Sequence, residues 1–158
     1  RGLAARGPAR PVVPERLLSL MDKANAYPLV EKTYPDALAG VLHAAPNATN
    51  YYDKFKLLIR DVWRFEQEDT LVFRIELENS SDSTIYYKPE DLAVRLEDRI
   101  YTQSIADASG VMPPKSTTPA FFAVTGNGQG GRNNLAPDNK WKILVVRAEG
   151  QRQPVESK

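Results

Sequence analysis

The segment from Thr70 to Asn79 constrains the fold most, because large apolar residues recur at every second position. These residues are Leu71, Phe73, Ile75 and Leu77. Successive side chains of a β-strand point to opposite faces, so this spacing buries one row and leaves the other in water. The pattern predicts a half-buried strand in an antiparallel sheet.

Further strand signals follow along the chain and are separated by clusters of Pro, Gly, Asn and Ser. No helical crossover of about a dozen residues, which parallel strands require, is found after residue 50. The sequence therefore predicts an all-β sandwich or barrel of six to eight antiparallel strands. The signals lie in residues 52–65, 70–79, 85–87, 92–102 (a hairpin with its turn at 97–99), 119–125 and 141–147, and residues 106–118 are expected to form a loop.

Two segments carry features that predict their place in the sheets. Asp61 interrupts an apolar row that consists of Phe55, Leu57, Ile59, Trp63 and Phe65. A charged residue in an inward row indicates either a β-bulge or a strand that emerges from the core. The run Ile143–Val146 is apolar on both faces, so we expect a central strand there.

The chain is long enough for one domain with appendages. Leu17, Leu20, Met21 and Ala24 have helical spacing after Pro14, and Pro28 is expected to end this short helix. Leu38, Val41 and Leu42 fit either a helical turn or a first strand, and the stretch from Pro46 to Asn50 is typical of a loop. The predicted organisation is a flexible arm (1–13), a helix with a connecting segment (14–50), the sandwich (51–149) and a flexible tail (150–158).

The charge balance and the apolar runs argue against two classes of partner. Lys and Arg number 21 against 20 Asp and Glu, which leaves a net charge of +1. Nucleic-acid-binding proteins usually carry a marked basic excess, so no nucleic-acid partner is expected. No run approaches the length of a membrane span, so we expect membrane association only through a lost upstream anchor or through a partner.

Catalytic and metal-binding signatures are sparse. His43 is the only histidine, cysteine is absent, and no G-x-S-x-G motif occurs. A satisfied or surface histidine is therefore the preferred interpretation of His43, and no enzyme activity, metal or cofactor is expected. Carboxylates that meet only in space, as in glycoside hydrolases, stay open as an alternative.

Two segments are candidates for partner contact. The glycine-rich stretch 126–132 lacks the Lys and Ser or Thr of a phosphate-binding loop, so it predicts a flexible connection, followed by candidate contact residues Arg132, Asn133 and Asn134. Tyr86 and Tyr87 are adjacent, so one of them points away from the core and can stack on a sugar or anchor a protein interface.

The sequences LVFRIELENSS at 71–81, Tyr86–Leu92 and NKWKILV at 139–145 resemble bacterial immunoglobulin-like domains. Such sandwich domains occur in secretion and conjugation channels and near type IV pili. The resemblance implies an immunoglobulin-like sandwich that acts as a structural or protein-interaction module of a cell-envelope assembly, with a protein partner or self-association. It further implies a periplasmic or cell-surface location, although the lack of cysteine also fits the cytoplasm. The alternative is a carbohydrate-binding module.

Overall fold

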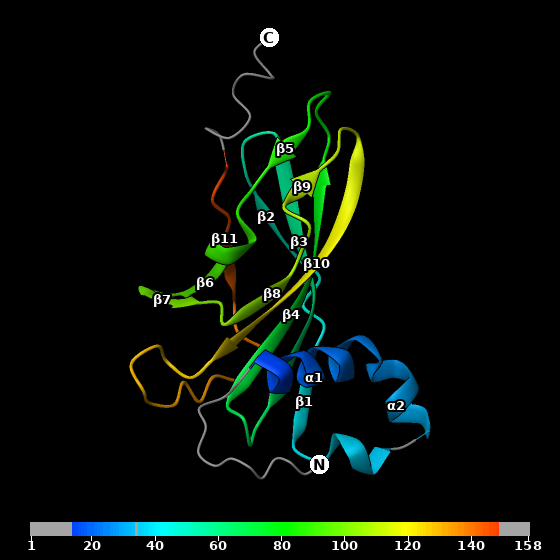
Figure 1. The fold of residues 1–158 in the computed structure, drawn as a ribbon, viewed down its shortest axis with the longest axis vertical. Coiled ribbons are helices and arrows are strands. Elements are labelled where there is room, and N and C mark those ends of the chain that lie inside the picture. Colours follow the sequence, from blue (N-terminus) through cyan, green and yellow to red (C-terminus); the bar gives the residue numbers. More distant parts are fainter. Residues whose placement is uncertain (1–13, 34, 149–158) are drawn as a thin grey trace.

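The computed structural model describes residues 14–33 and 35–148, which form mostly antiparallel β-sheets with two short helices (Figure 1). The all-β class is confirmed, whereas the immunoglobulin-like strand arrangement stays a prediction. The predicted arm at 1–13 and tail at 150–158 lie outside the described residues. No helix in the described part of the chain has the length and apolar character needed to cross a membrane.

The largest sheet contains six strands and is built around the segment Thr70–Asn79, whose alternation is the clearest strand signal in the sequence. Strand β4 (Thr70–Asn79) pairs over its whole length with β10 (Ser116–Thr125), from Asn79 opposite Ser116 to Thr70 opposite Thr125. The sheet order is β1-β3-β4-β10-β8, and β2 pairs with β3 beyond the end of β1. The remaining strands of this sheet are β1 (Val41–Ala44), β2 (Ala48–Tyr51), β3 (Phe55–Phe65) and β8 (Ile105–Asp107).

Two smaller sheets complete the fold. The predicted hairpin is confirmed, since β6 (Ala93–Leu96) pairs with β7 (Arg99–Thr102) across a turn in which Glu97 has a φ of 59°. Strand β11 (Lys142–Leu144) lies at the end of this sheet, which has the order β11-β6-β7, so the expectation of a central strand was wrong. Only Ile143 of β11 is buried. The other small sheet pairs β5 (Ile85–Tyr86) with β9 (Val111–Met112).

The main core lies on one face of the large sheet. It contains the predicted row of β4, every member of which is fully buried, together with residues of β10 and the smaller sheets. The ring of Phe73 stacks on Phe122 at a centroid distance of 5.0 Å and meets the edge of Trp141 at 5.1 Å. The indole of Trp141 also donates a hydrogen bond of 2.9 Å to the carbonyl of Pro137, which satisfies its buried N–H.

A second core lies on the opposite face, where helix α1 (Pro14–Asn25) covers the lower end of the large sheet (Figure 1). Leu20, Met21 and Ala24 of α1 are buried there, as the helical spacing predicted. They pack against Trp63, Phe65, Val72 and Ala123. The side chain of Leu17 lies outside the described part of the helix.

A β-bulge in β3 determines which of its residues enter each core. Ile59 faces Ile75 and Asp61 faces Arg74, so Arg60 is the extra residue and the bulge interpretation of Asp61 is confirmed. Residues after the bulge change face. The single apolar row expected for β3 was therefore wrong, because Trp63 and Phe65 lie beneath α1 and not with Ile59.

Three other segments differ from expectation. Pro28 lies in the first turn of a second helix, α2 (Tyr27–Thr33), where a missing N–H costs little, so it does not end helical structure. A 3-10 turn (Pro35–Leu38) and β1 follow α2, so the large sheet begins at Val41 and not at residue 51. Strand β2 occupies residues that were expected to form a loop. The segment 106–118 contains all of β9 and the ends of β8 and β10. Each of these parts covers too few residues to show alternation. A further 3-10 turn spans Pro89–Asp91.

Candidate functional site

The bulge places the carboxylate of Asp61 between side chains from two neighbouring strands. Nε2 of His43 on β1 lies 2.8 Å from Oδ1, and Nε of Arg74 on β4 donates a hydrogen bond of 2.7 Å to Oδ2. The Asp61 side chain is only 13% exposed, so these partners supply contacts that water would otherwise make. Because an ionised carboxylate only accepts hydrogen bonds, Nε2 of His43 acts as the donor.

Three aromatic rings lie beside this carboxylate. The His43 ring stacks on Trp63 with centroids 5.3 Å apart, and Tyr27 of α2 lies 4.9 Å from His43 and 5.9 Å from Trp63. Trp63 is almost fully buried, and its Nε1 has no acceptor among the described residues. Burial raises the pKa of the Tyr27 hydroxyl, and the nearby Glu31 carboxylate adds to this effect.

A hollow of about 280 Å³ opens between the two helices and the sheet at this place. Asn25 and Pro28 border it from the helices, and none of its lining residues is Ser, Thr or Cys. The lining thus places no Ser, Thr or Cys nucleophile beside the His43–Asp61 pair, and the groups present are suited to hydrogen bonding and stacking. The lining residues are Ala24, Asn25, Tyr27, Pro28, His43, Asp61, Trp63 and Arg74.

Strand β1 borders this hollow and is an edge strand. The N–H of Glu66 donates a hydrogen bond of 2.9 Å to the carbonyl of Gly40, and bonded pairs alternate along an antiparallel ladder. The backbone groups of Leu42 and Ala44 therefore point toward β3, and those of Val41 and His43 point outward. In the described part of the chain no hydrogen bond reaches these two outward N–H groups, so β1 offers an open edge.

The predicted contact residues of the 126–134 loop lie elsewhere and surround the carboxylate of Asp69. Arg64 donates to Oδ1 of Asp69 at 2.7 Å, and the backbone N–H groups of Asn133 and Asn134 donate at 2.6 and 3.0 Å. Burial alone would raise the pKa of Asp69, but these donors outweigh it and hold the pKa below its usual value. The loop is thus tied to the turn between β3 and β4.

Asn133 fills a structural position within this network. Its Nδ2 donates to the carbonyls of Asp69 and Gly126 at 3.2 and 2.8 Å, and its Oδ1 accepts from Arg64 at 3.0 Å. Arg132 instead has a side chain that is 53% exposed. Partner contact by this loop stays a prediction, and Arg132 is the residue best placed for it.

The predicted tyrosine pair divides between the surface and the core. Tyr86 is 38% exposed, whereas Tyr87 is buried in the main core and burial raises the pKa of its hydroxyl. Both residues border a hollow of about 260 Å³ that also includes Lys88 and Glu90. Tyr86 is thus the member of the pair that a ligand can reach, and this hollow is separate from the Asp61 site.

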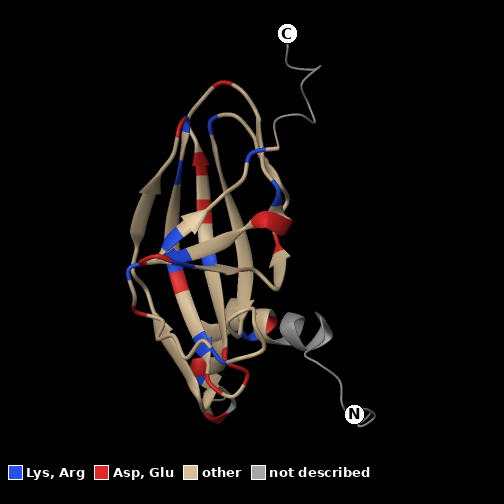
Figure 2. Ribbon diagram, turned by 90° about the vertical axis from the view of Figure 1, so that its left-hand side faces the viewer, with Lys and Arg blue, Asp and Glu red and all other residues tan. Residues whose placement is uncertain are grey.

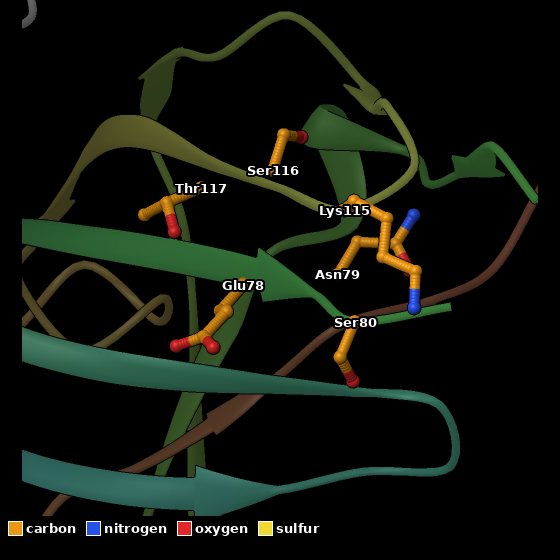
Figure 3. A pocket seen from close by; sticks show the side chains of 6 residues that line it. All are labelled: Glu78, Asn79, Ser80, Lys115, Ser116 and Thr117. Carbon is orange, nitrogen blue, oxygen red and sulfur yellow. The ribbon is translucent and has the colours of Figure 1, made fainter. Parts of the chain in front are cut away.

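A third hollow, of about 300 Å³, lies where β4 and β10 meet the turns that adjoin them (Figure 3). Figure 3 shows the carboxylate of Glu78 and the amine of Lys115 pointing away from one another, and Lys115 lies 3.5 Å from Asp82 instead. Asn79 is fully buried and donates to the carbonyls of Ser83 and Met112 at 2.8 and 2.9 Å. The polar groups here mainly hold the turns together.

Sequence reasoning missed the Asp61 site, although Asp61 itself was noticed. The charge inside an apolar row was a usable signal, because a buried carboxylate needs partners that can satisfy it. Those partners, His43 and Arg74, are 18 and 13 residues away in sequence, and their proximity depends on strand register. In the described ranges no three His, Cys, Asp or Glu side chains gather closely enough to bind a metal.

Comparisons with known proteins give no family. No family model matches the chain, and no curated protein matches it. A conserved hypothetical protein from Bacillus anthracis is similar in structure over 70% of this chain and 98% of its own, with 11% identity and a TM-score of 0.45. A functionally unknown protein from Listeria monocytogenes EGD-e covers 68% of this chain and 86% of its own, with 7% identity and a TM-score of 0.42.

Proposed function

We propose that this chain is a non-enzymatic protein-interaction module whose β1 edge receives an extended segment of a partner protein. An added strand would hydrogen-bond to the outward backbone groups of Val41 and His43. Its side chains on the helix-covered face would lie above the hollow beside Tyr27 and Trp63. The open β1 edge next to this aromatic hollow is the observation that carries the proposal.

The two kinds of contact have different roles in such a mode of binding. Backbone hydrogen bonds give affinity for any extended chain, and pockets for alternate side chains give specificity. The hollow offers stacking surfaces from Tyr27 and His43, and a guanidinium on Arg74 that already binds Asp61. Tyr51 of β2, which is 75% exposed, extends the same sheet edge and provides an aromatic anchor.

We further propose that the partner belongs to a bacterial cell-envelope assembly at the periplasm or cell surface, such as one associated with a pilus. The resemblance to immunoglobulin-like envelope domains supports this assignment. Figure 2 shows Lys or Arg and Asp or Glu interspersed along neighbouring strands, a surface suited to protein contacts of mixed charge.

The proposal is tested by removing one outward N–H. His43→Pro deletes a donor that the ladder with β3 does not use, so the fold is expected to persist while strand addition is blocked. Proteins captured from an envelope extract by the wild type should disappear with His43→Pro. His43→Ala reports the contribution of the side chain alone.

Thr102→Pro is the matched control, because β7 is also an edge strand. The N–H of Gln103 donates to the carbonyl of Leu92 at 3.1 Å, so the N–H of Thr102 points outward. Thermal unfolding establishes that each variant is folded. Equal loss of capture with Thr102→Pro, or full capture by folded His43→Pro, would contradict strand addition at β1.

We propose carbohydrate binding as the second candidate, and one observation favours it. Tyr86 is an exposed aromatic ring at the border of a hollow that also contains Lys88 and Glu90. Sugars are bound by an aromatic surface beside hydrogen-bonding groups. Binding on a glycan array that Tyr86→Ala abolishes and His43→Pro leaves intact would favour this function over the first.

A further inference from the structure

Asn127 and Gly128 form the only Asn-Gly pair in the sequence, and they lie in the turn that follows β10. Gly128 has a φ of 83°, and an added Cβ would meet no atom within 4 Å. The space on the Cβ side of Gly128 is therefore open, and its backbone nitrogen follows directly after an amide side chain. This spacing lets a backbone nitrogen reach the side-chain carbonyl carbon of the preceding residue in a five-membered ring.

The hydrogen bonds of Asn127 are distributed unevenly over its amide group. Oδ1 accepts from the backbone N–H of Gln129 at 2.8 Å and of Gly131 at 3.1 Å. In contrast, Nδ2 of Asn127 and the N–H of Gly128 have no hydrogen-bond partner among the described residues. The carbonyl is thus polarised, while no hydrogen bond among the described residues has to break at the attacking nitrogen or at the departing nitrogen.

We propose that Asn127 is a site of spontaneous deamidation in the folded protein. The Gly128 nitrogen loses its proton and forms a bond to Cγ of Asn127, which places negative charge on Oδ1. The two N–H donors already directed at Oδ1 stabilise that charge as an oxyanion hole does. The bond from Cγ to Nδ2 then breaks, and Nδ2 leaves with added protons as ammonia.

The cyclic imide that remains is opened by one water molecule at either carbonyl carbon. The product at position 127 is aspartate or isoaspartate, and the overall reaction consumes water and releases ammonia without any oxidation or reduction. The net charge of the chain falls from +1 to zero, because a neutral amide becomes a carboxylate.

The two products have different consequences for the loop. Aspartate retains an oxygen that accepts from Gln129 and Gly131. Isoaspartate adds a methylene group to the main chain inside a turn that the 3.1 Å bond from the Asn127 N–H to the Gly131 carbonyl closes. Isoaspartate therefore displaces the segment leading to Arg132, the exposed member of the predicted contact residues.

Asn133, in the same loop, supplies an internal control. Its Nδ2 donates to two carbonyls, and the backbone N–H that follows it, on Asn134, donates to Asp69 at 3.0 Å. Both the leaving group and the attacking nitrogen are therefore held. The structure thus ranks Asn127 as reactive and Asn133 as protected.

The test is incubation of the purified chain at mildly alkaline pH, followed by peptide mapping by mass spectrometry and an isoaspartate assay. We expect conversion at Asn127 before any other asparagine, with a rate that rises with pH. Gly128→Ala should suppress it, because a side chain there obstructs the attacking nitrogen. Gly130→Ala, at a position with a φ of 86° and equally open surroundings, is the matched control and should leave the rate unchanged.

The contribution of the fold is measured by repeating the incubation in urea. A rate in the folded chain at least equal to that in urea supports activation by the two N–H donors. A folded-state rate lower by more than about tenfold, an added barrier of about 1.4 kcal/mol, would overturn the proposal. Conversion of Asn133 ahead of Asn127 would overturn it as well.

Discussion

The two faces of the large sheet are built from the same strands but by different means. One face is a continuous apolar core that contains the alternate residues of β4 and β10. The other is divided between a small core under α1 and a polar half with the pairs Arg60–Glu76 and Lys56–Glu78 at 3.0 and 3.6 Å. The candidate site lies where these halves meet, because the bulge turns Asp61 onto this face. The one extra residue thus sets which side chains of β3 belong to the face that stabilises the fold and which belong to the face that can carry recognition.

Deletion of Val62 should have the largest effect on this division. Val62 is fully buried and faces Phe73, so without it the later residues of β3 would move to the opposite face, and Trp63 and Phe65 would lose their places beneath α1. We expect this variant to lose cooperative unfolding in urea, followed by tryptophan fluorescence. Deletion of Arg60 is the control, because it turns the pairs Ile59–Ile75 and Asp61–Arg74 into neighbours in a regular ladder and keeps each residue on its face, so cooperative unfolding should persist. Cooperative unfolding of the Val62 deletion near the wild-type midpoint would contradict this division of β3 between the two faces.

Truncations on the two faces should differ in cost. Phe73→Ala removes a fully buried ring that contacts Phe122 and Trp141, and should lower the free energy of unfolding by about 4 kcal/mol. Met21→Ala, in the smaller core under α1, should lower it by about 2 kcal/mol. Urea denaturation measures both values. A larger loss for Met21→Ala would mean that the helix-covered face is the principal core.

The charge cluster that holds the 126–134 loop should come next in size. Asp69→Asn leaves the buried Arg64 guanidinium without its carboxylate and should cost about 3 kcal/mol at neutral pH. Because the folded-state pKa of Asp69 is lowered, its stabilisation is present above the unfolded-state value and lost as the pH falls through the folded-state value. The difference between wild type and variant should therefore shrink in acid, as urea unfolding across a pH series would show.

Glu66→Gln is the matched control for this substitution. Glu66 also contacts Arg64, at 3.4 Å, but its side chain is 46% exposed. Its loss should cost about 0.5 kcal/mol or less, since water screens such a pair. Equal effects of the two substitutions would show that burial does not govern the cluster.

The sequence predicted the apolar face well and the other face poorly, for reasons that these residues illustrate. The alternation in β4 is local, so Leu71 to Leu77 could be placed without knowing their partners. The Asp61 site depends on contacts between residues 13 and 18 positions apart, which strand register brings together. The Asp69 cluster depends on contacts that a loop makes from up to 65 positions away. Strand β2 was missed because its four residues, Ala48–Tyr51, are too few to show a period.

The smallest expected effect concerns Tyr52, whose ring stacks on Phe55 at 4.7 Å while its hydroxyl is buried without a partner among the described residues. Tyr52→Phe removes that unsatisfied group and should leave stability unchanged or raise it by up to about 1 kcal/mol. Burial raises the pKa of Tyr52 from 10.0 to about 12, so the folded chain retains a proton that the unfolded chain releases. Wild-type stability should fall as the pH rises between those values, and the variant should lack this part of the loss. Tyr51→Phe, at the exposed neighbouring position, should retain it, and urea unfolding in alkaline buffers would detect a variant that behaves otherwise.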